Sequence, residues 1–220
     1  MTADSAGVFG TVGILGGTGP QGRGLAVRFA QAGLSVIIGS RNSERAGEVA
    51  ASLGHGIGGV DNVACATDSD LIIVAVPWDG HADLLISLKD ALHGKIVVDC
   101  VNPLGFDKQG PYGLAVESGS ACEQAAALLP GSVVVGAFHH LSAELLEDPS
   151  VTAIDADVLV LGDDRDATDM VQALAECIPG IRGVFAGRLR NAHQVEALTA
   201  NLIAINRRYK AHSGVRIAGI

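Results

Sequence analysis

A glycine-rich run between an apolar segment and an amphipathic one constrains the fold of this chain most strongly. Val12–Leu15 is typical of a short buried strand, and the residues after the run place Gly22, Leu25, Ala26 and Phe29 on one face of a helix that ends near Gly33. The run itself reads Gly16-Gly17-Thr18-Gly19-Pro20-Gln21-Gly22. Glycines at this spacing allow a tight turn, a close backbone approach to a pyrophosphate, and close packing of helix on strand. The diphosphate would meet the amides at the helix N-terminus and the positive end of the helix dipole. The run therefore predicts a Rossmann-type dinucleotide-binding domain.

Strand and helix patterns continue to alternate along the chain. We expect further strands at Ser35–Gly39, around Val63, and at Leu71–Val76, Lys95–Asp99, Val133–Phe138 and Val158–Leu161. Amphipathic helices are expected between them, a glycine-rich loop at Gly105–Gly113, and a long last helix at about Leu189–Lys210. Continuous apolar strands in this order predict an α/β fold, a doubly wound and mostly parallel sheet covered on both faces.

We expect three segments in this arrangement. Residues 1–11 would be a flexible N-terminal extension, and residues 12–187 the dinucleotide-binding Rossmann-type domain. Residues 188–220 would form a smaller C-terminal helical portion packed on that domain.

Composition excludes several classes of protein. Hydrophobic residues make up 48% and charged residues 18% of the chain, the balance of a compact α/β enzyme rather than a disordered protein. No apolar run approaches the roughly 18 residues of a membrane span, and the start lacks a secretory signal. The four cysteines are scattered without a C-x-x-C pair, so we expect reduced thiols in the cytoplasm.

Charge is unevenly distributed. The net charge is −9, which argues against nucleic-acid binding, yet residues 182–220 hold seven basic residues and one acidic residue, Glu196. This basic end indicates either a solvated helix terminus or a site for a polyanionic ligand.

The residues after the second strand indicate which dinucleotide is bound. An NAD site places a carboxylate here to accept a hydrogen bond from the ribose 2′-hydroxyl. This chain has Gly39-Ser40-Arg41 instead, with Arg45 one helical turn later. A hydroxyl and two guanidinium groups would bind a 2′-phosphate that a carboxylate would repel, so the sequence predicts NADP(H).

No other catalytic motif accompanies this site. The seven histidines have no metal-ligand spacing, so we expect no metal, and there is no G-x-S-x-G nucleophile motif. His139-His140 follows an expected strand and is a candidate acid or base. Of the reaction classes considered, hydride transfer remains, because it needs from the protein mainly the positioning of the reactants and the exclusion of water.

The chain resembles the coenzyme F420-dependent NADP reductases. The resemblance runs from about Val12 to Tyr209 and rests on Ile14–Gly19, Gly39–Arg41, Val76-Pro77-Trp78, Gly162-Asp163-Asp164, Asn191 and Val195–Thr199, in the order and spacing of that family. It implies reversible hydride exchange between reduced F420, an 8-hydroxy-5-deazaflavin, and NADP⁺. The two rings would lie face to face in a cleft between the Rossmann domain and the C-terminal portion, within a homodimer.

The resemblance also implies roles for particular residues. Thr18 would touch the nicotinamide side of the cleft, and Val76, Pro77 and Trp78 would line the NADP channel. His139, Leu141 and Ala143 belong to the segment beside the stacked rings, and Thr199 would stand near the deazaflavin. We therefore expect His139 and Thr18 as catalytic residues. The cofactor-binding residues would be Gly17, Thr18, Gly19, Pro20, Gln21, Gly22, Ser40, Arg41, Arg45, Val76, Pro77, Trp78, Leu141, Ala143 and Thr199.

Three positions depart from the archaeal pattern near the expected deazaflavin pocket. At these positions this chain has His193 in place of an arginine, Ala197 in place of a serine and Ser142 in place of a proline. The basic residues Arg207, Arg208 and Lys210 would partly compensate, because the deazaflavin carries a phosphate and a glutamate tail. Two alternatives stay open from the residues: an NADPH-dependent reductase of a small imine, keto acid or flavin, and a non-catalytic NADP(H) sensor.

Overall fold

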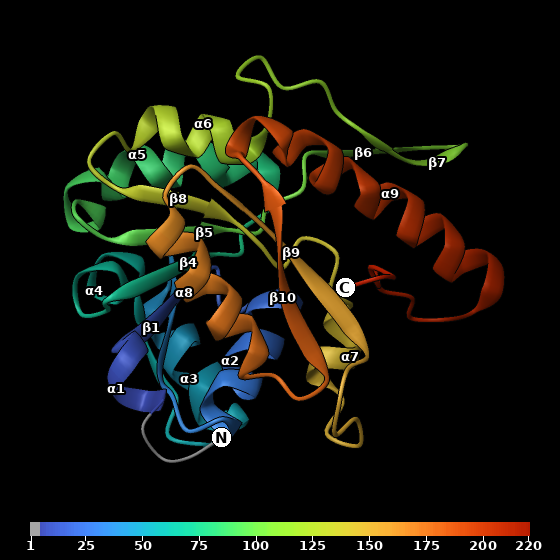
Figure 1. Cartoon of the computed structure of the whole chain (residues 1–220). Helices are drawn as coiled ribbons and strands as arrows, with labels where there is room; N and C mark the ends of the chain where they lie inside the picture. The colour runs from blue at the N-terminus through green and yellow to red at the C-terminus, as the bar shows by residue number, and fades with distance from the viewer. Residues whose placement is uncertain (1–4) are drawn as a thin grey trace.

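A single twisted sheet forms the centre of the molecule in the computed structural model, which describes residues 5–220 (Figure 1). Its strands are β1 (Thr11–Leu15), β2 (Ser35–Ser40), β3 (Gly58–Asp61), β4 (Leu71–Val74), β5 (Ile96–Asp99), β8 (Val133–Gly136), β9 (Ala156–Gly162) and β10 (Ile181–Gly187). They lie in the order β10-β9-β8-β5-β4-β1-β2-β3. From β3 to β8 neighbouring strands are parallel, which gives the Rossmann order, and the predicted α/β fold is confirmed.

The last two strands run the other way. β9 pairs antiparallel with β8 through Val135–Gly162 and Gly136–Leu161, and β10 then pairs parallel with β9. Because of this register, the start of β9 extends past the carboxyl end of β8. The sheet thus gains a side wall at the edge where a doubly wound fold binds its ligands.

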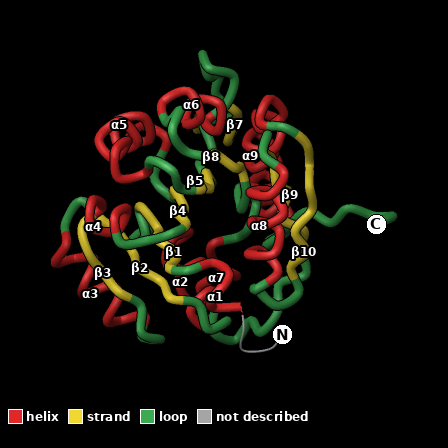
Figure 2. The backbone as a smooth tube through the Cα atoms, turned by 60° about the vertical axis from the view of Figure 1, so that its left-hand side comes forward, coloured by secondary structure: helices red, strands yellow, loops and turns green. Residues whose placement is uncertain are grey.

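Helices cover both faces of the sheet (Figure 2). The helices are α1 (Ser5–Phe9), α2 (Pro20–Gln31), α3 (Ser43–Leu53), α4 (Asn62–Thr67), α5 (His81–Leu92), α6 (Ala121–Leu128), α7 (Ala143–Glu147), α8 (Arg165–Glu176) and α9 (Ala192–Tyr209), with 3-10 turns η1 (Trp78–Gly80) and η2 (Leu189–Asn191). One core cluster joins α2, α3 and α8 to the sheet, and another joins α4, α5 and α6 to the opposite face. Within residues 5–220, no helix combines the length and the apolar composition needed to cross a membrane.

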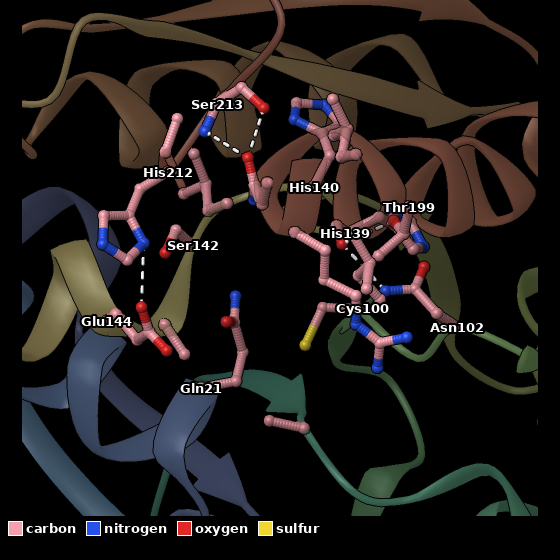
Figure 3. Close-up of a pocket in the computed structure, with 18 of the residues that line it drawn as sticks. Gln21, Cys100, Asn102, His139, His140, Ser142, Glu144, Thr199, His212 and Ser213 are labelled. Atoms are coloured by element: carbon pink, nitrogen blue, oxygen red, sulfur yellow. Dashed lines mark hydrogen bonds and ion pairs between the residues drawn. The ribbon is translucent and has the colours of Figure 1, made fainter. Parts of the chain in front are cut away.

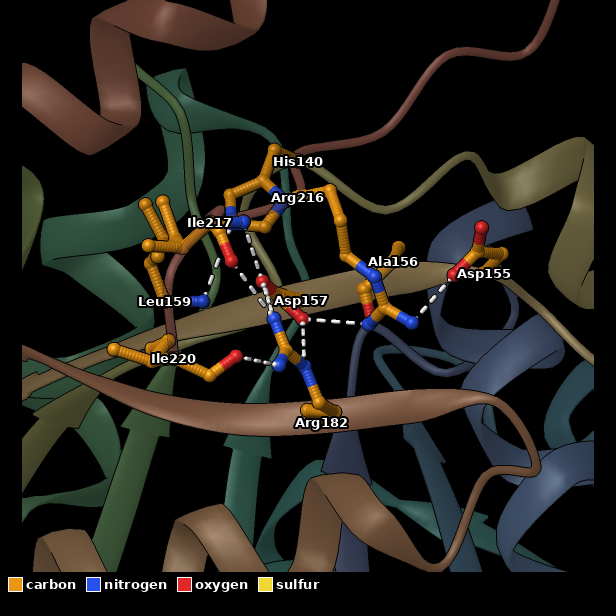
Figure 4. A network of polar contacts seen from close by, with 9 residues as sticks. All are labelled: His140, Asp155, Ala156, Asp157, Leu159, Arg182, Arg216, Ile217 and Ile220. Atoms are coloured by element: carbon orange, nitrogen blue, oxygen red, sulfur yellow. Dashed lines mark hydrogen bonds and ion pairs between the residues drawn. The ribbon is translucent and has the colours of Figure 1, made fainter.

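The C-terminal part of the chain lies against the sheet rather than apart from it. α9 packs beside a two-stranded hairpin, β6 (Leu104–Asp107) and β7 (Gly110–Gly113), which Figure 1 shows next to α9. After α9 the chain returns to β9, where buried Asp157 accepts hydrogen bonds from Arg182 (2.7 Å), Arg216 (2.7 Å) and the amide of Ile217 (2.6 Å) (Figure 4). These bonds hold the pKa of Asp157 well below its usual range, with the Arg182 hydrogen bond the largest cause.

Several elements differ from those expected. Residues 1–4 of the expected flexible extension lie outside the described part of the chain, but α1 follows them, Phe9 is buried, and β1 begins at Thr11. The strand expected around Val63 was wrong. Residues 58–61 form β3 instead, and Asp61 caps α4 by accepting from the amides of Val63 and Ala64. The loop expected at Gly105–Gly113 is the β6–β7 hairpin, and β10 was not expected at all.

Candidate active site

Two adjoining cavities open at the carboxyl edge of the parallel strands. The first, about 990 Å³, lies over the turns that follow β1, β2, β3 and β4, and we call it the dinucleotide cavity. The second, about 760 Å³, lies between the ends of β4 and β5, the segment after β8, and α9; we call it the second cavity. Ala75 and Val76, directly after β4, line both. The two cavities therefore meet beside the strand-order switch between β1 and β4, where α/β sheets of this kind bind ligands.

The glycine turn forms one wall of the dinucleotide cavity. Gly16 has φ +74°, a left-handed conformation that favours glycine, and a Cβ there would lie 2.6 Å from the carbonyl oxygen of Ala75. A Cβ at Gly22 would lie 2.6 Å from Cα of Gly17, so the third glycine of the motif lets α2 pack against the turn. Thr18 and Gly19 line the cavity, and Pro20 is the first residue of α2. This is the cradle that the sequence motif predicts for a diphosphate.

A second wall carries the cationic groups. Ser40, Arg41 and Arg45 line the dinucleotide cavity, as the sequence predicts for a 2′-phosphate site. Neither guanidinium group has a hydrogen bond or ion pair to any residue in the described range 5–220. Asn42 caps α3 by accepting from the amide of Arg45 at 2.9 Å, which keeps the start of that helix at the cavity. The two guanidinium groups are thus held at the cavity with no paired carboxylate among the described residues, as an anion-binding site requires.

The wall after β4 is held by a buried histidine–aspartate pair. Pro77 lines the dinucleotide cavity, whereas Trp78 stacks on the ring of His81 with centroids 5.5 Å apart. His81 Nε2 lies 2.6 Å from Asp99 Oδ2, and its Nδ1 lies 3.0 Å from Gln124 Oε1. Burial alone would lower the pKa of His81, but the charge of Asp99 and these hydrogen bonds outweigh it and raise the pKa. Trp78 therefore acts through packing on the His81 ring rather than as part of the cavity surface.

The second cavity gathers residues from segments far apart in the sequence (Figure 3). His139 stands at its floor, and the main-chain carbonyl of His139 accepts hydrogen bonds from Asn102 Nδ2 (2.8 Å) and Thr199 Oγ1 (3.0 Å). Gln21, from the glycine-rich run, also lines this cavity and donates to the carbonyl of Phe138 at 3.2 Å. Thr199 and Gln21 thus hold the segment after β8 at the place where the two cavities meet.

Both histidines of this segment are neutral near pH 7. Burial lowers the pKa of His139 and of His140 to about 4. His139 Nδ1 is buried and has no hydrogen-bond partner among the described residues, while His140 Nε2 accepts from the amide of Leu159 at 3.3 Å. A neutral, buried imidazole has no proton to donate as a strong acid, so His139 can shape the cavity but is unsuited to general acid catalysis at neutral pH.

One group of possible metal ligands lies below the floor, within the part of the chain that the structure describes. Cys122, His139 and Glu196 bring their ligand atoms within 4.8 Å of one another. Glu196 already accepts hydrogen bonds from the amides of Ala121 (2.9 Å) and Cys122 (3.1 Å) at the start of α6. Burial raises the pKa of the Cys122 thiol well above its usual range, so the thiolate that a metal needs is disfavoured. The arrangement is that of a capped helix end.

The outer end of the second cavity lies at the end of α9. Asn206 Oδ1 accepts from the amide of Ser213 at 2.7 Å, and Lys210, with φ +50°, ends the helix between them. His212 Nδ1 pairs with Glu144 Oε2 at 2.8 Å. These contacts fold residues 210–213 over the cavity, where Arg207 and Lys210 also line it.

The residues predicted from the sequence divide between the two cavities. Six of those expected to bind NADP, besides Val76, line the dinucleotide cavity: Thr18, Gly19, Ser40, Arg41, Arg45 and Pro77. Gln21, His139, Leu141, Ala143 and Thr199 line the second cavity. Gly17, Pro20, Gly22 and Trp78 line neither and act through the turn, the helix start or packing.

Sequence reasoning missed other residues of the site. Asn102 had a local signal, because it follows the buried strand β5 by three residues, and polar residues after such a strand lie at the carboxyl edge of the sheet. Asn62 lines the dinucleotide cavity with its Oδ1 buried and unpartnered among the described residues. Glu144, Asn206 and residues 211–213 reach the second cavity only through contacts between distant segments, which no local pattern reveals.

Comparisons with known proteins agree with this architecture. Residues 11–103 match the family model described as NADP oxidoreductase coenzyme F420-dependent. The chain is 36% identical to the F420-dependent NADP reductase of Methanothermobacter thermautotrophicus, over 95% of each chain, and 36% identical to that of Methanocaldococcus jannaschii, over 95% of this chain and 98% of the relative. A crystal structure from Arthrobacter sp. FB24, whose assignment as an F420-dependent NADP reductase is itself provisional, superposes with a TM-score of 0.80 at 25% identity, covering 96% of this chain and 99% of the other. With identity at this level over nearly the whole length, the chain belongs to the family of F420-dependent NADP reductases.

Proposed function

We propose that this protein catalyses reversible hydride transfer between reduced coenzyme F420 and NADP⁺. The observation that carries the proposal is the meeting of the two cavities at Ala75 and Val76, in a chain that belongs to this reductase family. One hydride passes from the reduced deazaflavin to the nicotinamide, and one proton is released to solvent as NADPH forms. Each cavity takes one substrate, and the two rings meet where the cavities adjoin.

The residues of the dinucleotide cavity themselves support NADP as its ligand. The glycine turn leaves Gly19 open to a diphosphate, since a Cβ there would meet only the carbonyl oxygen of Gly16, at 3.4 Å. Arg41 and Arg45, which have no side-chain partner among residues 5–220, stand where a 2′-phosphate would lie, and no carboxylate follows β2 directly in the sequence. In our proposal, Ser40, Arg41 and Arg45 bind the 2′-phosphate while Thr18 and Val76 position the nicotinamide.

The second cavity supports direct transfer without an acid catalyst. Hydride transfer between two rings needs alignment and exclusion of water more than proton donation. His139 is neutral because burial lowers its pKa to about 4, and its carbonyl is held from two sides by Asn102 and Thr199. In our proposal His139, Leu141 and Ala143 form a rigid surface against the deazaflavin. The comparisons do not favour the alternatives of an imine, keto acid or flavin reductase or a silent NADP(H) sensor.

The test is an absorbance assay with purified protein. NADPH with oxidised F420 should lose the visible absorbance of the deazaflavin, and reduced F420 with NADP⁺ should restore it. FMN and a cyclic imine in place of F420 serve as controls for the alternative substrates. Binding of NADPH without any change in deazaflavin absorbance would contradict the proposed reaction.

We further propose a cytoplasmic homodimer. Four buried free thiols, Cys65, Cys100, Cys122 and Cys177, are suited to a reducing compartment. Phe106 and Tyr112 on the β6–β7 hairpin are exposed, as is Tyr209 at the end of α9, and exposed apolar surface of this kind is typical of a protein contact. Light scattering of the purified protein measures the oligomeric state, and a monomer at micromolar concentration would contradict the homodimer.

A further inference from the structure

The outer end of the second cavity is cationic on one side. Among its lining residues, the charged groups are Arg207, Lys210, Glu144 and His212. Glu144 is already engaged by His212, whose Nδ1 lies 2.8 Å from Glu144 Oε2. Arg207 and Lys210 have no ion pair or hydrogen bond to another side chain in residues 5–220, and both are exposed. The cavity mouth therefore presents two uncompensated positive charges.

This charge is placed by a folded helix end. The amide of Ala211 donates to the carbonyl of Asn206 at 3.2 Å, and the amide of Ser213 donates to the Asn206 side chain. Farther along, Arg216 and Ile217 are tied to buried Asp157 on β9. The segment after α9 is thus anchored at Asn206 (Figure 3) and at Asp157 (Figure 4), and Lys210 lies in it as a lining residue of the cavity.

Neighbouring basic residues do not share this position. Arg208 follows Arg207 directly on α9 and is equally exposed, but it does not line the cavity. A helix C-terminus favours any cation through its dipole, so the dipole alone would treat the two arginines alike. Only a ligand in the cavity would distinguish Arg207 from Arg208, because successive residues on a helix point about 100° apart.

We infer that Arg207 and Lys210 bind the anionic tail of the second substrate and thereby orient it. This inference rests on the proposed function. The ring end of the cavity, near Ala75, Val76 and Gln21, holds uncharged lining groups, whereas the phosphate and glutamate carboxylates of the deazaflavin lie at the far end of that molecule. The substrate then enters with its ring toward the dinucleotide cavity and its tail along the end of α9.

The test compares charge reversals at adjacent positions. Arg207→Glu and Lys210→Glu should each raise KM for full-length F420 by roughly 5- to 10-fold, a typical loss for an exposed charge-assisted contact. Both should leave kcat and the KM for NADPH unchanged. Arg208→Glu, which makes the same charge change on the same helix turn, should change none of these constants by more than about twofold. The KM of the wild type should rise steeply with salt and that of Arg207→Glu much less, because charge attraction at a surface is screened beyond about 8 Å at physiological ionic strength.

A truncated deazaflavin without phosphate and glutamates separates this inference from the proposed function. With that substrate the wild type and the variants should have equal KM values. If Arg207→Glu and Arg208→Glu raise KM for full-length F420 equally, or if the truncated substrate shows the same increase, the assignment of these residues to the tail is wrong while the reductase function stands. If the wild type turns over neither deazaflavin, both the function and the inference are overturned.

Discussion

In the proposed function, dinucleotide choice depends most directly on Arg41. Its guanidinium group lines the dinucleotide cavity and makes no contact to a carboxylate within residues 5–220. Replacing it in Arg41→Asp removes a charge-assisted contact worth about 1.5–3 kcal/mol and adds repulsion. We expect the ratio of kcat/KM for NADPH to that for NADH to fall by at least about 10-fold.

Steady-state kinetics with both dinucleotides measure this ratio. Arg165→Asp is the control, because Arg165 is exposed at the start of α8 and pairs with Asp169 rather than lining a cavity. An unchanged ratio in Arg41→Asp would place the 2′-phosphate elsewhere.

His139 gives a second prediction at the scale of one residue. Since burial lowers its pKa to about 4, its protonation should not appear in the pH profile of kcat between pH 6 and 8. His139→Asn should slow turnover by about 10- to 100-fold at most, because only positioning is lost. Complete loss of turnover in a variant that still binds both substrates would require proton transfer by His139.

Single residues also show what a sequence can reveal. Ser40 and Arg41 were predictable because a βα turn places its first residues at the cofactor, a local relation. The contact of Thr199 with the carbonyl of His139 spans 60 positions, and that of Asn102 spans 37. Thr199 could be assigned to the site only through family resemblance, and Asn102 only through its place shortly after a buried strand.

At the scale of elements, Glu196 ties α9 to α6. Its buried carboxylate accepts hydrogen bonds from the amides of Ala121 and Cys122 at the N-terminus of α6. Glu196→Ala leaves both amides buried and unpaired and should lower the free energy of unfolding by about 2–4 kcal/mol. Glu196→Gln keeps one acceptor oxygen and should lose less.

Urea unfolding of both variants measures these differences. Glu44→Ala is the matched control, because Glu44 lies in the first turn of α3 and is exposed. Equal losses in Glu196→Ala and Glu44→Ala would mean that the cap on α6 contributes little.

Elements were predicted well where one face is apolar and poorly where glycine dominates. The strands around Ile14 and Ile73 are fully buried, so their patterns were continuous. β3 reads Gly-Gly-Val-Asp, and β10 contains Gly183 and Gly187 and lies half exposed at the sheet edge. Gly59 is required by its neighbour, since a Cβ there would lie within 3 Å of the backbone of Ala46, a contact that only the folded structure reveals. Tertiary packing, not local propensity, makes these segments strands.

For the whole molecule, buried histidines whose pKa values are shifted in opposite directions predict a maximum in the free energy of unfolding near neutral pH. Burial lowers the pKa of His139 and His140 to about 4, below the unfolded value of about 6.5. Between these values the unfolded chain binds more protons, so stability falls as pH drops from about 6.5 to 4, by up to about 3 kcal/mol for each histidine. His81 has a raised pKa, so the stability from its pair with Asp99 is complete below about pH 6.5 and is lost as pH rises through its folded pKa.

Urea unfolding from pH 5 to pH 9 tests both limbs. His140→Asn should flatten the acid limb, and His81→Asn should flatten the alkaline limb without changing the other. A stability curve that keeps both slopes in both variants would show that other groups determine the pH dependence.

Because β9 and β10 run opposite to the other strands of the sheet, the two cavities are built from different parts of the chain. The dinucleotide cavity is built from residues before position 89, whereas the second cavity takes most of its lining from residues after position 99. The wall that β9 makes past the carboxyl end of β8 supports His140 and the returning tail, and it leaves the glycine turn and Arg41 untouched. Substitutions in the wall, in α9 or in the residues after α9 can therefore change which second substrate is bound without altering the residues of the dinucleotide cavity. In a fold arranged in this way, changes confined to the second half of the chain can alter the partner in hydride transfer while the first half keeps its dinucleotide cavity.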